Sequence, residues 1–72
     1  MASSVTRMNN YLQSKGQAHL LSWSESSSGP SNQIAWTIQC KVDGDVLGTG
    51  VADTKASARE AAASQALQTL GL

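Results

Sequence analysis

The stretch from residue 35 to residue 44 alternates polar or small side chains with apolar ones and ends in a turn signal: Ala35-Trp36-Thr37-Ile38-Gln39-Cys40-Lys41-Val42-Asp43-Gly44. A period of two is typical of a strand that buries one face, here the face of Trp36, Ile38, Cys40 and Val42. Asp-Gly is a strong signal for a two-residue hairpin turn. The stretch therefore predicts a half-buried strand over residues 35–42 that turns back at Asp43-Gly44.

The segments on either side of this strand predict two more strands. Over residues 19–25, Leu21 and Trp23 alternate with serines, which is typical of a half-buried strand. The serines, glycine, proline and asparagine of residues 26–32 then predict a turn. After the hairpin, residues 45–51 predict a third strand. Its glycines, Gly48 and Gly50, indicate a close backbone approach or a sheet edge.

A helix is expected at each end of the chain. Met8 and Leu12 recur at helical spacing, which predicts a helix over residues 6–15 that Thr6 caps and Gly16 ends. An alanine-rich helix is predicted from about residue 55 to residue 70, with Thr54 or Asp53 as its N-cap and Gly71 at its end. Residues 1–4 are expected to form a flexible lead-in to a domain over residues 5–72.

The predicted fold class is α+β, in the order helix, three antiparallel strands, helix. Both helices must cover the same face of the sheet, because only one face is apolar. The expected core collects the apolar positions of these elements: Tyr11, Leu12, Leu21, Trp23, Trp36, Ile38, Cys40, Val42, Leu47, Ala58, Ala62, Ala66, Leu67 and Leu70.

Length and charge restrict the function further. The 72 residues make one small domain, and 40% of them are hydrophobic, which is enough for a core. Five basic and five acidic residues give a net charge of zero, which excludes a polycation that coats nucleic acid or membrane by charge alone. No apolar run approaches the ~20 residues that span a bilayer, and no signal peptide is apparent. We therefore expect an intracellular protein, cytoplasmic or nuclear, that is not secreted and does not bind a membrane.

The residues that carry chemistry are too few for an enzyme. The one cysteine, Cys40, cannot form an internal disulfide, and with the one histidine, His19, it falls short of the four ligands of a structural metal site. Asp43 and Asp45 flank a turn, where solvated carboxylates are the usual outcome. We expect no catalytic residues, no metal, no cofactor and no small-molecule substrate, and thus a binding module rather than an enzyme.

Two polar clusters are candidates for a binding surface. Lys55 and Arg59 are four residues apart on one helix face near its start, where cations and the positive end of the helix dipole suit a phosphate. Asn9, Asn10 and Gln13 of the first helix offer amides for 2′-hydroxyls and base edges. Taken alone, each cluster is more often an ordinary solvated face.

Taken together, the clusters and the order of elements resemble the double-stranded RNA-binding domain family over about residues 5–70. The resemblance rests on Gly29-Pro30 before the alternating strand, the glycines after the hairpin and the alanine-rich final helix. Each feature is weak alone, and the combination is specific. The segments that carry the resemblance are 8–13, 28–32, 36–42, 44–50 and 54–63.

The resemblance implies binding of an A-form RNA duplex, by shape, through three regions. The first helix would enter one minor groove, the loop between the first two strands would enter the next, and the start of the last helix would contact phosphates between them. The matching positions are Asn9, Asn10 and Gln13; Gly29, Pro30, Ser31 and Asn32; and Thr54, Lys55 and Arg59. The chain departs from the family pattern at Asn10, where a glutamate is usual, at Asn32, where a histidine is usual, and at Ala56, where a second lysine is usual. One phosphate-directed cation fewer predicts weaker binding and a salt slope lower by about one unit.

Two functions remain open at this point. The first is a module that binds double-stranded RNA within a larger protein of RNA processing, silencing or regulation. The alternative is a domain of the same fold that mediates protein–protein interaction or dimerisation and binds RNA weakly or not at all. Low net charge, Ala56 and Asn32 favour the alternative, whereas Lys55, Arg59 and Gly29-Pro30 favour RNA.

Overall fold

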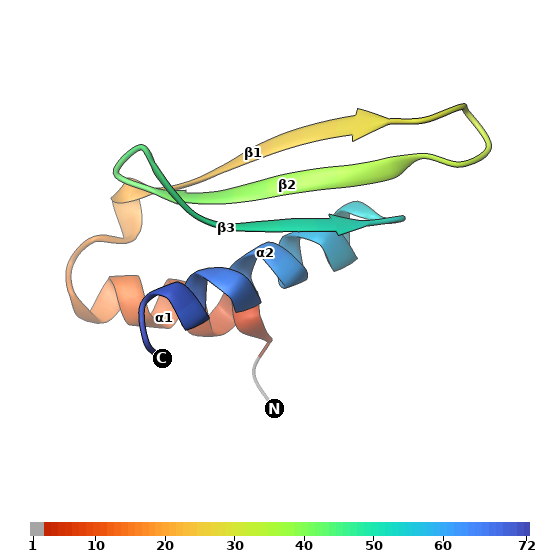
Figure 1. The fold of residues 1–72 in the computed structure, drawn as a ribbon. Coiled ribbons are helices and arrows are strands. Elements are labelled where there is room, and N and C mark those ends of the chain that lie inside the picture. Colours follow the sequence, from red (N-terminus) through yellow and green to blue (C-terminus); the bar gives the residue numbers. More distant parts are fainter. Residues whose placement is uncertain (1–2) are drawn as a thin grey trace.

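The computed structural model describes residues 3–72, which form one three-stranded sheet and two α-helices (Figure 1). The elements are α1 (Ser4–Ser14), the short 3₁₀ helix η1 (Ala18–Leu20), β1 (Leu21–Ser28), β2 (Ala35–Val42), β3 (Asp45–Ala52) and α2 (Lys55–Thr69). The strands pair antiparallel in the order β1-β2-β3. The predicted α+β fold and its element order are confirmed. Of the predicted lead-in, residues 1–2 lie outside the described residues.

The central strand is β2, the strand that the alternating stretch predicts. Its inward side chains Ile38 and Cys40 are fully buried, and in the register Trp23 of β1 and Gly48 of β3 both lie opposite Cys40. At the hairpin, Asp43 and Gly44 both have positive φ values, 54° and 83°. Two successive positive φ angles are what a tight hairpin turn requires, so the Asp-Gly prediction is confirmed.

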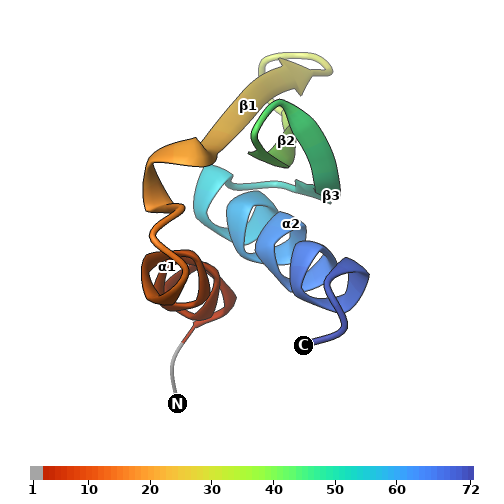
Figure 2. The same ribbon diagram turned by 90° about the vertical axis from the view of Figure 1, so that its left-hand side faces the viewer.

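Both helices lie on the same side of the sheet (Figures 1 and 2). Helix α2 packs directly on β2 and β3, and α1 packs beside α2. The buried core is a cluster formed by both helices and the sheet: Met8, Leu12, Ile38, Cys40, Ala58, Ala62, Ala63, Ala66 and Leu67. The sheet is therefore covered on one face, as the apolar alternation predicts.

The core is smaller than the sequence predicts, and its membership differs. Met8 and Ala63 are fully buried although they were not among the expected core residues. Seven expected core residues are only partly buried and pack around the cluster: Tyr11, Leu21, Trp23, Trp36, Val42, Leu47 and Leu70. A domain of this size buries only about 60% of the surface that its unfolded chain exposes, less than a larger domain does, so side chains at the rim of the sheet keep contact with water.

Helix α2 approaches β3 so closely that only glycine fits at two strand positions. A Cβ atom added at Gly48 would overlap the backbone oxygen of Ala62, and one added at Gly50 would overlap the backbone oxygen of Ala58. The alanines of α2 present the smallest side chains that still favour a helix, and they allow this approach. The predicted close backbone approach is confirmed, and β3 is also an edge strand.

Three predicted boundaries are wrong for identifiable reasons. Residues 19 and 20, predicted as the start of the first strand, belong to the 3₁₀ helix η1 (Ala18–Leu20), so β1 begins at Leu21. Helix α1 begins at Ser4 because the hydroxyl of Ser3, and not that of Thr6, accepts a hydrogen bond from the first turn, 3.1 Å from the Thr6 backbone nitrogen. Strand β1 continues through residues 26–28, which were predicted as turn, because their backbone pairs with β2 as far as Ser28 opposite Ala35. Backbone pairing does not need apolar side chains, so the serines gave no strand signal.

Candidate nucleic-acid interface

The cations Lys55 and Arg59 form one cluster at the start of α2. The helix begins at Lys55 because the Thr54 hydroxyl caps it, accepting a hydrogen bond from the Ser57 backbone N–H at 3.1 Å. Lys55 and Arg59 lie on the same helix face, since both side chains reach Glu25 of β1. Their side chains are 56% and 43% exposed, so both charges are accessible from solution. The structure therefore places a cation pair next to the positive end of the α2 dipole.

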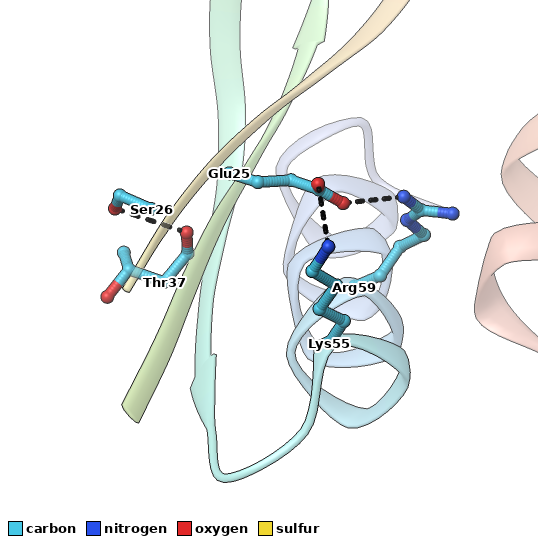
Figure 3. A network of polar contacts seen from close by, with 5 residues as sticks. All are labelled: Glu25, Ser26, Thr37, Lys55 and Arg59. Atoms are coloured by element: carbon cyan, nitrogen blue, oxygen red, sulfur yellow. Dashed lines mark hydrogen bonds and ion pairs between the residues drawn. The ribbon is translucent and has the colours of Figure 1, made fainter. Parts of the chain in front are cut away.

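Sequence reasoning missed the acidic member of this cluster, Glu25. One carboxylate oxygen lies 2.7 Å from Arg59 Nη2 and the other lies 3.9 Å from Lys55 Nζ. Figure 3 shows Glu25 extending from β1 toward α2, whereas Ser26 and Thr37 lie on the other side of their strands. The signal was available, because the alternation of Leu21 and Trp23 continues to residue 25 and puts Glu25 on the helix side of the sheet.

Each of the two cations lies over the ring of a tryptophan. Lys55 Nζ lies 4.8 Å from the ring centre of Trp36, and Arg59 Cζ lies 5.5 Å from that of Trp23. Both distances are within the range of a cation–π contact. The sequence predicts that Trp23 and Trp36 are core residues. In the structure both are only half-buried, and the cation pair lies over their rings.

The polar residues of α1 fall on one flank of the helix. At 3.6 residues per turn, Asn9, Asn10 and Gln13 lie within about 100° of arc. Asn9 is half-buried, and its side-chain amide donates to the backbone oxygen of Val5 at 3.0 Å. Asn10 and Gln13 are exposed. Two of the three predicted side chains are thus presented to solution, whereas Asn9 is partly engaged within its own helix.

A carboxylate of α2 fixes the beginning of α1. The oxygens of Glu60 accept hydrogen bonds from the backbone N–H groups of Ser4, at 2.5 Å, and Val5, at 3.2 Å. These bonds, led by the one from Ser4, lower the pKa of Glu60, because they stabilise the charged carboxylate. Glu60 is one residue beyond Arg59, so the two polar clusters are connected through a single turn of α2.

The loop between β1 and β2 covers residues 29–34 and forms a tight turn. The backbone N–H of Gln33 donates to the oxygen of Pro30 at 2.9 Å, which places Ser31 and Asn32 at the tip. Gly29 has a φ of 104°, a conformation that other residues rarely adopt, and an added Cβ would overlap the Gln33 oxygen. All four predicted loop residues, 29–32, are exposed.

The three predicted regions lie around one edge of the molecule. In Figure 2, α1, β1 and the first turn of α2 lie on the side away from β3. In Figure 1, the β1–β2 loop projects at the same end of the molecule as the start of α2. The site residues that the sequence predicts are therefore all on the surface or at its margin, on three separate elements.

We compared the sequence with models of known protein families. A family model of the double-stranded RNA binding motif matches residues 4–70, nearly the whole chain. The chain belongs to the double-stranded RNA-binding motif family. No curated protein matches the sequence.

Membership of the double-stranded RNA-binding motif family gives a coarse function. Domains of this family bind double-stranded RNA and are binding domains rather than catalytic ones, so the partner class at the level of the family is duplex RNA. The match includes α1, the β1–β2 loop and α2, that is, every element that carries a predicted contact.

Other chemistry-bearing groups lie outside the cluster of cations. Cys40 is buried in the core of the double-stranded RNA-binding motif, and burial raises the pKa of its thiol. In residues 3–72, no three His, Cys, Asp or Glu side chains gather as a metal site would require, and no pocket opens. None of the helices in this part of the chain is long and apolar enough to cross a membrane.

Proposed function

We propose that this domain binds A-form double-stranded RNA by shape, through α1, the β1–β2 loop and the start of α2, as a module of a larger protein of RNA processing or regulation. The observation that carries the proposal is the family match over residues 4–70 together with two exposed cations at the start of α2. Each region contributes a different kind of contact.

The start of α2 is the phosphate-binding region in this proposal. Lys55 and Arg59 each neutralise one phosphate, and binding releases the counterions condensed there. The tryptophan rings at 4.8 Å and 5.5 Å limit the motion of the two cations, so less side-chain entropy is lost on binding. The Thr54 hydroxyl is engaged in capping, and its part is to present the helix end.

The other two regions contact minor grooves. Asn10 and Gln13 of α1 are exposed and can both donate to and accept from 2′-hydroxyls, and Ser31 and Asn32 at the loop tip can do the same. In A-form RNA the minor groove is wide, shallow and lined with 2′-hydroxyls, whereas B-form DNA has a narrower groove and no such hydroxyls. Selectivity for RNA follows from this difference and does not depend on base sequence.

Charge removal at matched positions tests the phosphate region. Lys55→Ala and Arg59→Ala should each weaken binding to a ~20-base-pair RNA duplex and reduce the slope of log K against log salt by about one unit. Lys41→Ala is the control, since it removes the same charge at the hairpin end of β2, opposite Val46, whereas α2 starts after the other end of β3, which pairs with Trp36. Equal salt slopes for Lys55→Ala, Lys41→Ala and the parent protein would show that α2 does not contact phosphates.

The alternative function, protein association through the same fold, is favoured by one feature of the surface. Val46 and Val51 of the edge strand β3 are 48% and 63% exposed. Sedimentation equilibrium across a hundredfold range of concentration separates the two functions when it is combined with the RNA titration. Dimer formation without binding of duplex RNA at low salt would favour the alternative.

A further inference from the structure

Glu25 occupies the position from which a carboxylate reaches both cations of α2. It lies on β1 opposite Ile38, and its side chain points toward the helices, where an apolar residue would continue the pattern of Leu21 and Trp23. Its oxygens lie 2.7 Å from Arg59 Nη2 and 3.9 Å from Lys55 Nζ (Figure 3). The cluster of Glu25, Lys55 and Arg59 therefore carries a net charge of one and not two.

The Glu25 carboxylate occupies a hydrogen-bond donor of Arg59 that a phosphate could otherwise bind. A guanidinium has five N–H donors in a fixed fork, and a phosphate binds best through two of them. In Arg59, Nη2 donates to Glu25 at 2.7 Å, and Nε is buried without a hydrogen-bond partner among the described residues. A phosphate from solution is therefore left with the N–H groups of Nη1 and Nη2, and it must displace the Glu25 carboxylate to use the Nη2 donor that now points to it.

Glu25 is not needed to hold the cations in place. Lys55 lies over the Trp36 ring and Arg59 over the Trp23 ring, and neither contact involves the carboxylate. The three side chains of the cluster are 31% to 56% exposed, and an ion pair at such exposure stabilises a domain little. The larger effect of Glu25 is therefore on an incoming anion.

We propose that Glu25 is an internal competitor for backbone phosphates that lowers the affinity of this domain for duplex RNA. The proposal rests on the proposed function, since it requires that Lys55 and Arg59 contact the duplex. Duplexes that fill the other two regions displace the carboxylate, and isolated phosphates or short duplexes do not. Glu25 thus makes stable binding depend on contacts along the full length of the site.

The size of the effect follows from one unit charge near the phosphate. A carboxylate that contacts both cations lies within a Debye length, about 8 Å at 0.15 M salt, of any phosphate they bind, so salt screens it only in part. At about 4–6 Å in bulk water, removing one such repulsion changes affinity about three- to sixfold, and the lower dielectric at a protein surface raises this toward tenfold or more. Neutralising Glu25 also raises the effective cation count, which steepens the salt slope by up to about one unit.

Glu25→Gln is the test, because glutamine keeps the shape and removes the charge. Asp45→Asn is the matched control: it changes the net charge equally at an exposed position at the other end of β3 from the start of α2. Affinity for a ~20-base-pair RNA duplex is measured at several salt concentrations, with thermal unfolding as a check on the fold. We expect tighter binding by about three- to tenfold and a steeper salt slope for Glu25→Gln, with a smaller change for Asp45→Asn.

The outcomes separate this proposal from the proposed function. Unchanged or weaker binding by Glu25→Gln, while Lys55→Ala still reduces the salt slope, would overturn the competitor role and leave the RNA function standing. An equal increase in affinity for duplex RNA in Glu25→Gln and Asp45→Asn would show that only the net charge matters, and it would also overturn the competitor role. Absence of binding by the parent and by Glu25→Gln at low salt would overturn both, whereas binding by Glu25→Gln alone would support the competitor role.

Discussion

Glu60 joins the two helices that carry most of the proposed contacts, and replacing it with glutamine tests how α1 is held. Each carboxylate oxygen accepts one backbone N–H from the first turn of α1, that of Ser4 or that of Val5. These N–H groups have no partner within their own helix, because the first turn of any helix lacks acceptors for them. Glutamine can accept only one of the two bonds and turns its NH₂ toward the other donor.

The expected loss of stability follows from the hydrogen bond and the charge that glutamine lacks. A hydrogen bond to a charged group contributes about 1.5–3 kcal/mol when buried, and less at this half-exposed position. A negative charge at a helix N-terminus adds about 0.3–1 kcal/mol. We expect Glu60→Gln to lower the free energy of unfolding by about 1–2 kcal/mol. In a domain of this size each kcal/mol moves Tm by about 4–8 °C.

The effect of pH provides a second readout with a definite sign. The pKa of Glu60 is lowered in the folded protein, chiefly by the bond from Ser4, so its carboxylate stabilises the fold above the pKa of an unfolded glutamate. That contribution is lost as the pH falls through the lowered pKa. The difference in Tm between the parent and Glu60→Gln should therefore shrink as the pH is lowered from 7 to 3.

Thermal unfolding followed by circular dichroism at pH 7, 5, 4 and 3 measures both effects. Asp45→Asn is the control, since it removes an exposed carboxylate from the hairpin. A Glu60→Gln protein with the Tm of the parent at pH 7 would refute the reasoning. So would a difference in Tm that stays constant down to pH 3.

Three further predictions follow from the packing and from the cation cluster. Gly50→Ala should lower the free energy of unfolding by about 1–3 kcal/mol or more in chemical denaturation, because its Cβ would overlap the backbone of α2 at Ala58; a change below about 0.5 kcal/mol would contradict the packing. Cys40 should react with a thiol reagent far more slowly in the folded protein than in denaturant, since it is buried and burial raises its pKa; equal rates would contradict its burial. Ala56→Lys should tighten binding to duplex RNA and steepen the salt slope by about one unit, because residue 56 is exposed beside Lys55; an unchanged slope would argue against phosphate contacts there.

The fold could be predicted from the sequence because its signals are local. The alternation over residues 35–42, the Asp43-Gly44 turn and the alanine-rich helix each depend on neighbouring residues, and each is confirmed. Gly48 and Gly50 were expected to mark a close approach, and the contact with α2 confirms it. Where side chains gave no periodic signal, as in the serines that end β1, the boundary was wrong.

The cation cluster could be predicted only in part, because its acidic member is distant in sequence. Lys55 and Arg59 are four residues apart, and helical geometry alone puts them on one face. The alternation in β1 puts Glu25 on the helix side of the sheet, but its contact with the two cations depends on how the sheet is placed over α2, which no local pattern specifies. The same holds for Glu60, whose partners at the start of α1 lie 55 and 56 residues earlier in the chain.

The central claim, binding of duplex RNA by shape through three regions, is tested most directly by an NMR titration of the labelled domain. A ~20-base-pair RNA duplex and the DNA duplex of the same sequence are added at low and at moderate salt. We expect amide shifts confined to residues 9–13, 29–32 and 54–59 with RNA, weaker at moderate salt and absent with DNA. Shifts of the same size with DNA, or no shifts with RNA at low salt, would contradict the claim.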